Sequence, residues 1–149
     1  MGIFVDENDL FPIKIWYKEF RDDDGDLIYT DVSSEEKDGW DELECFFCQP
    51  SVGIFSHVLE EATVLNALNQ KPVIRTRILR DLSLIYLMKK WSARHNDAPV
   101  PINEETINSL DFKIANEIFL QYIYNVRLDI YLQAIIKDES ESENILRRF

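Results

Sequence analysis

The chain has 149 residues, of which 46% are hydrophobic, and its formal net charge is −12. This length suffices for one ordinary domain with its own core, and four glycines and five prolines are too few for a collagen-like or low-complexity protein. The acidity argues against general nucleic-acid binding, which depends on neutralising phosphates, but it allows a carboxylate-covered surface to imitate nucleic acid.

The pattern of apolar residues predicts neither a secretory signal nor a membrane span. Asp6, Glu7 and Asp9 interrupt the start of the chain, where a signal would need an apolar run. The longest apolar region, 112–136, is broken by a polar residue at least every four positions. We therefore expect a soluble protein of a reducing, cytosol-like compartment.

Residues 12–48 are expected to form a small antiparallel sheet. Residues 12–20 are rich in β-formers and partly alternate, residues 27–32 are the expected partner strand, and Asp24-Gly25 is a turn signal between them. After a polar loop at 33–41, a third strand is expected from Glu42 to Phe47 or Cys48, where Pro50 stops it.

The pattern then becomes helical. A first amphipathic helix is marked by Val58, Leu59, Ala62, Leu65 and Leu68 and is expected to end near Asn69 and Pro72. A second helix is expected over 74–91, apolar nearly all round at 84–88, and a loop over 92–103 ends at Asn103 as a helix N-cap.

The last expected helix, 111–136, is the longest, at about 38 Å for a rise of 1.5 Å per residue. It carries one narrow polar stripe at intervals of four residues, formed by Lys113, Glu117, Gln121, Asn125, Asp129 and Gln133. Taken together, the chain predicts a single α+β domain over 1–137. It consists of a small N-terminal antiparallel sheet followed by three to four helices, and residues 138–149 are a charged C-terminal tail.

Charge is unevenly distributed along the chain. Residues 71–95 contain seven basic residues and one acidic residue, whereas residues 1–70 contain four basic and seventeen acidic residues. Such a separation of basic from acidic residues indicates docking to a partner rather than catalysis. Arg75, Arg77 and Arg80 are therefore candidates for contact with phosphates or an acidic partner; alternatively, they neutralise the chain's own acidic hairpin.

Two short motifs have the spacing of known sites. Cys45 and Cys48 form a CxxC, but at an odd separation in a strand they point to opposite faces. Buried structural cysteines are therefore favoured over a thiol or metal site. Asp22 to Asp26 resembles part of a calcium loop, but Phe20 would occupy the first ligand position, so a solvated hairpin tip is favoured.

Enzyme signatures are not found in the sequence. It contains no GxGxxG, no P-loop and no GxSxG motif, and its four scattered glycines cannot build a phosphate cradle. We therefore predict a protein that is not an enzyme and has no cofactor or metal.

The arrangement from residue 42 to 123 resembles the tail assembly chaperones and baseplate hub assembly proteins of tailed bacteriophages. The resemblance rests on a strand running into Cys48-Gln-Pro-Ser-Val-Gly53, an amphipathic helix, the stretch Leu79-Arg-Asp-Leu-Ser-Leu-Ile-Tyr-Leu-Met-Lys-Lys-Trp-Ser92, a polar loop, Pro101-Ile-Asn-Glu-Glu-Thr-Ile-Asn-Ser-Leu110 and a long last helix.

This resemblance implies a non-enzymatic phage protein that binds other tail or baseplate proteins, in the host cytoplasm or in the virion tail. It would hold the tape-measure protein before the tube polymerises or help assemble the baseplate hub. Whether such a protein is a transient chaperone or a permanent subunit stays open.

A last helix that is apolar on most faces needs a partner, either another copy or a client helix. The predicted contact surface on this helix is Phe119, Tyr122, Ile123, Val126 and Ile130. We expect protein partners, with a homo-oligomer left open, and neither a membrane nor direct contact with nucleic acid. The alternative is an acidic inhibitor that imitates nucleic acid and blocks a host DNA-binding enzyme.

Overall fold

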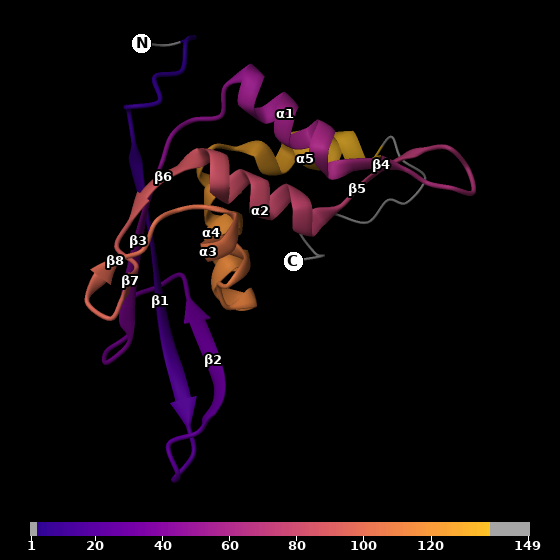
Figure 1. Cartoon of the computed structure of the whole chain (residues 1–149). Helices are drawn as coiled ribbons and strands as arrows, with labels where there is room; N and C mark the ends of the chain where they lie inside the picture. Colours follow the sequence, from indigo (N-terminus) through magenta and orange to yellow (C-terminus); the bar gives the residue numbers. More distant parts are fainter. Residues whose placement is uncertain (1–2, 138–149) are drawn as a thin grey trace.

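The computed structural model describes residues 3–137 (Figure 1), so the expected charged tail, 138–149, lies outside the described residues. Four antiparallel strands form one sheet in the order β2-β1-β3-β6. They are β1 (Phe11–Arg21), β2 (Leu27–Ser33), β3 (Asp41–Phe47) and β6 (Met88–Trp91). The predicted hairpin and third strand are confirmed, and β6 is an additional strand at the edge.

The register of the sheet explains which side chains enter the core. Ile13 pairs with Cys45 and Ile15 with Leu43, so all four lie on the same face, and all four are buried. On the opposite face, Lys14 lies between the carboxylates of Glu42 and Glu44, at 3.5 and 3.6 Å. One face therefore packs against helices, and the other carries charge.

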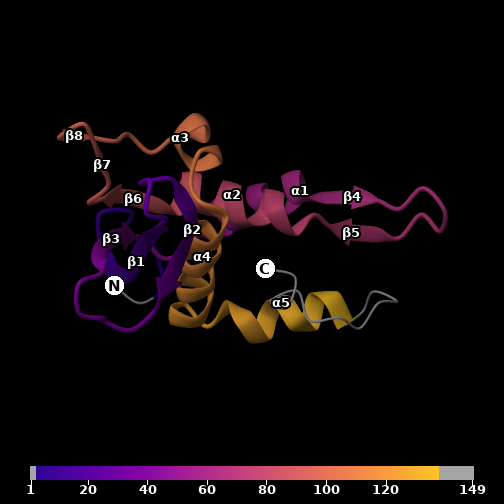
Figure 2. The same cartoon turned by 90° about the horizontal axis from the view of Figure 1, so that it is seen from below.

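The helices lie on one side of this sheet (Figure 2), which confirms the predicted α+β class. They are α1 (Val52–Ala62), α2 (Thr76–Leu87), α3 (Glu104–Asn108), α4 (Phe112–Asn125) and α5 (Leu128–Lys137). Two small hairpins join them, β4 (Thr63–Leu65) with β5 (Pro72–Ile74), and β7 (Arg94–His95) with β8 (Ala98–Pro99). Asn103 caps α3 as expected, through a capping box with Thr106. Among residues 3–137, no helix combines the length and apolar character that crossing a membrane requires.

The first two helices end earlier than predicted. The helix α1 stops at Ala62, and Thr63–Leu65 instead pairs with Pro72–Ile74. The helix α2 stops at Leu87, and Met88–Trp91 pairs with β3. In both places, antiparallel pairing with a distant segment satisfies the backbone and overrides the local helical pattern.

The predicted long last helix is two helices. The backbone turns at Val126 and Arg127, where Arg127 has a φ of +60°, and α5 leaves in a new direction (Figure 2). This turn brings Leu132 to full burial and the ring of Tyr131 to 5.9 Å from that of Phe55 on α1. Two short helices can cover more of their apolar sides against one small domain than a single straight rod.

An aromatic cluster joins α4 to the sheet. The ring of Tyr122 lies 4.7 Å from that of Phe47 and 6.0 Å from that of Phe11, measured between centroids. The Tyr122 hydroxyl donates a hydrogen bond of 3.1 Å to the carbonyl oxygen of Cys48. Burial raises the pKa of Tyr122, so this hydroxyl stays protonated and remains a donor.

We expect the substitution Tyr122→Phe to lower the free energy of unfolding by about 1–3 kcal/mol, because it removes the donor from a buried carbonyl group. Tyr124→Phe is the matched control, since Tyr124 lies on the same helix and is 52% exposed. Urea unfolding followed by circular dichroism measures both. Equal midpoints for the two variants would contradict this role of the hydroxyl.

Candidate protein-interaction surfaces

The turn between β1 and β2 forms one projecting end of the molecule. The Gly25 N–H donates to the Asp22 carbonyl at 3.0 Å, and the Asp22 N–H donates to the Asp26 carbonyl at 2.9 Å. Gly25 has a φ of +84°, a left-handed conformation that glycine adopts without steric cost. The segments on both sides are strands, so Asp22 to Asp26 is the tip of a hairpin.

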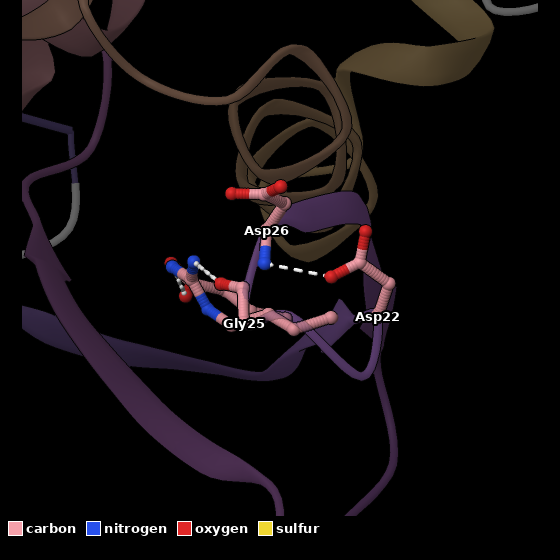
Figure 3. Close-up of polar contacts among 5 residues, drawn as sticks. Asp22, Gly25 and Asp26 are labelled. Atoms are coloured by element: carbon pink, nitrogen blue, oxygen red, sulfur yellow. Dashed lines mark hydrogen bonds and ion pairs between the residues drawn. The ribbon is translucent and has the colours of Figure 1, made fainter.

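The carboxylate of Asp22 is used to hold this turn together. Its Oδ1 accepts a hydrogen bond of 3.0 Å from the N–H group of Asp24. It accepts a second bond, of 2.9 Å, from the N–H group of Asp26 (Figure 3). Arg21 donates to the carbonyl of Gly25 and forms an ion pair with Glu19. The side chains of the other three acidic residues of the turn are exposed, namely Asp23, Asp24 and Asp26.

Apolar side chains adjoin these carboxylates. Leu27 is 52% exposed and Ile28 is 61% exposed at the start of β2. Tyr29 follows, with its ring stacked on that of Phe20 at 4.7 Å and the ammonium of Lys113 at 5.4 Å from its centroid. We call the segment Asp22 to Tyr29 the acidic tip.

The β4–β5 hairpin forms a second projecting end, which extends beyond the helices (Figures 1 and 2). Its loop is held by backbone hydrogen bonds from Asn66 to Lys71 and from Gln70 to Asn66. The side chains of Asn66 and Asn69 accept further bonds from the N–H groups of Leu68 and Lys71. The side chain of Leu68, in this loop, is 96% exposed, so it contributes almost nothing to the packing of the domain.

The same end is basic. We call residues 63–77 the basic arm, because they contain Lys71, Arg75 and Arg77 and no acidic residue. Arg77 is exposed, and Arg75 is exposed with its guanidinium donating to the carbonyl of Glu61 at the end of α1. Leu65, 64% exposed, lies within the arm.

The predicted cluster of three arginines is divided between surface and interior. Arg80 is buried, and its guanidinium donates to Asp81 at 2.8 Å and to Asn116 on α4 at 2.7 Å. It thereby links α2 to α4. Arg75 contacts Glu61, and Arg80 contacts Asp81 and Asn116. None of these three partners belongs to the acidic hairpin.

The predicted apolar contact surface on the last helix is not a single exposed face. Phe119, Tyr122 and Ile123 are fully buried, and Val126 is half-buried, because α4 packs on the sheet and the chain turns after it. Ile130, beyond the turn, is 62% exposed. The burial of three members contradicts the expected exposure, and Ile130 is the one that can meet a partner without rearrangement.

The two cysteines are buried and unpaired with each other. Burial raises the pKa of the Cys45 thiol to about 12 and also raises that of Cys48. A thiol kept protonated is a poor nucleophile and a poor metal ligand, which agrees with a structural role. Within residues 3–137, no three His, Cys, Asp or Glu side chains gather as a metal site would require.

We expect Asp22→Ala to lower the free energy of unfolding by about 1 kcal/mol, because the turn loses an acceptor for two N–H groups. Asp23→Ala is the matched control, since it removes a carboxylate from the same turn without removing those bonds. Chemical denaturation measures the loss, and hydrogen exchange at the Asp26 N–H locates it. Equal effects of the two substitutions would show that Asp22 does not hold the turn.

Comparison with known proteins adds no assignment. The chain matches no protein-family model, no curated protein and no solved structure at a significant level. The acidic tip, the basic arm and the exposed side of α5 are therefore the features that bear on its function.

Proposed function

We propose that the chain is a non-enzymatic assembly protein of a bacteriophage tail or baseplate that acts through protein–protein contacts. Two points support the proposal: the resemblance over residues 42–123 and the incompletely covered helix α5. The tape-measure protein and the baseplate proteins are the proposed partners. The host cytoplasm, or the virion tail, is the proposed location.

The observation that carries the proposal is the exposed side of α5. Of residues 128–134, only Leu132 is fully buried, whereas Ile130 is 62% exposed and Tyr131 is 52% exposed. Neighbouring apolar side chains on one helix are a usual anchor for a partner helix or groove. We therefore propose α5 as the contact site for a tail protein.

The first turn of α5 contains a second sign of incomplete packing. Within the described residues, Asp129 Oδ1 is a buried side-chain oxygen without a hydrogen-bond partner. A buried acceptor without a partner costs free energy, and a donor that satisfies it recovers that cost. A partner that covers Ile130 with apolar side chains would complete the packing of α5, and a shift of its first turn on binding would let a donor reach Asp129.

Imitation of nucleic acid is the less favoured alternative. The charge of a duplex extends along its whole length, with one phosphate per about 1.7 Å of axis. The exposed carboxylates of the acidic tip instead gather in one turn, where Asp22 is already used internally. The tip therefore offers a local charge rather than an extended, duplex-like one.

The test measures binding of the purified tape-measure and baseplate proteins of the encoding phage to the full chain by calorimetry. We expect Ile130→Glu to weaken the complex at least about tenfold, because it places a charge in an apolar contact. Phe112→Glu is the matched control, since Phe112 is 63% exposed at the start of α4, at the other end of that helix from α5.

Two results would contradict the proposal. Wild-type protein that binds neither kind of tail protein would remove the assembly function. A complex that Ile130→Glu and Phe112→Glu leave equally strong would remove α5 as its site. Circular dichroism of each variant verifies that the fold is retained.

A further inference from the structure

The two projecting ends of the molecule carry opposite charges. The acidic tip exposes Asp23, Asp24 and Asp26, and the basic arm carries Lys71, Arg75 and Arg77 without an acidic residue of its own. The nearest acidic residues along the chain, Glu60 and Glu61, lie on α1 at the base of the arm. The arm therefore presents positive charge in a protein whose net charge is −12.

Both ends also expose apolar side chains beside the charges. Leu65 and Leu68 are 64% and 96% exposed on the arm, and Leu27 and Ile28 are 52% and 61% exposed on the tip. The hydrogen bonds of the 66–71 loop and of the Asp22 turn hold the backbone of both ends in place before any contact forms. Preformed surfaces lose little conformational entropy on binding, which favours association.

The two ends cannot meet within one copy, because Figures 1 and 2 show them projecting from different parts of the molecule. We infer that the basic arm of one copy docks on the acidic tip of a second copy. Leu65 and Leu68 then cover Leu27 and Ile28, and the arm cations face the tip carboxylates. The contact removes apolar surface from water and pairs opposite charges at its rim.

Charge selects this head-to-tail arrangement over contacts between identical ends. An arm placed on an arm brings Lys71, Arg75 and Arg77 against their own copies, and a tip placed on a tip brings aspartates together. A head-to-tail contact leaves one arm and one tip free, so it continues into a closed ring or an open chain. The inference concerns copies of this chain alone and does not rest on the proposed function.

The test uses two variants of the full chain that each disable one end. Leu68→Asp disables the arm and leaves its loop bonds, which use the Leu68 backbone N–H. Asp23→Lys/Ile28→Thr disables the tip and keeps a β-branched residue in β2. Arg77→Glu is a second arm variant in case Leu68→Asp disturbs folding, and Val52→Asp is an exposed control outside both ends.

Sedimentation velocity over a range of concentrations measures the association. The mean sedimentation coefficients of wild type and Val52→Asp are expected to increase with protein concentration. The increase is expected to be smaller at high salt, which screens the charges. Each disabled variant alone is expected to associate at least about tenfold more weakly. An equal mixture of an arm variant and the tip variant is expected to form dimers and stop, because only one intact arm and one intact tip remain per pair.

The other outcomes overturn the inference. Wild-type protein that stays monomeric at every concentration shows that these ends serve a different partner or none. Association that the arm variant loses and the tip variant keeps shows an arm-to-arm contact. A mixture that forms no dimer excludes the head-to-tail arrangement, and because only the purified chain is used, this result leaves the proposed function untouched.

Discussion

The structure depends on the attachment of α4 to the sheet through Tyr122. Its ring packs on Phe47 and Phe11 from two strands, and its hydroxyl reaches the Cys48 carbonyl just past β3. The N–H of Cys48 donates to the carbonyl of Leu87, the last residue of α2. One short segment therefore joins the sheet, α2 and α4, and the rest of the molecule is positioned from this point.

This attachment also determines what reaches the surface. With α4 against the sheet, the chain has to turn at Arg127 before α5 can contact α1 through Tyr131 and Phe55. On the other side, α1 and α2 lead into and out of the β4–β5 hairpin, which extends beyond the core (Figure 2). The packing of α4 thus leaves α5 partly covered, and the basic arm extends away from the core. Both surfaces, like the acidic tip, are available to other proteins.

Short-range sequence signals are sufficient to predict the N-terminal strands and the N-cap of α3. Asp24-Gly25 between two β-rich runs and Asn103 before Glu104 act within a few residues, so the sequence reveals them. The ends of α1 and α2 depend on pairing with segments far along the chain, and the apolar run at 84–88 has no period that separates helix from strand. The turn at Arg127 lacks the glycine or proline that usually marks one.

The candidate surfaces also depend on contacts between segments that are distant in the sequence. The apolar character of their helix predicts a partner surface at Phe119, Tyr122 and Ile123, yet the domain itself buries them. The spacing of Leu65 and Leu68 predicts that they belong to an amphipathic helix, yet they lie on a hairpin and are exposed. The spacing of apolar residues predicts which side chains should be buried. Whether the domain itself or a partner buries them depends on the tertiary fold.

The most direct test of head-to-tail docking is disulfide trapping between copies, with Leu68→Cys in one and Ile28→Cys in the other. The native thiols interfere little, because Cys45 and Cys48 are buried and the pKa of Cys45 is raised to about 12. Head-to-tail docking predicts a disulfide between residues 68 and 28 that forms in the mixture faster than either variant links to itself. Equal or faster linkage of Leu68→Cys to itself, or no linkage at all, would contradict it.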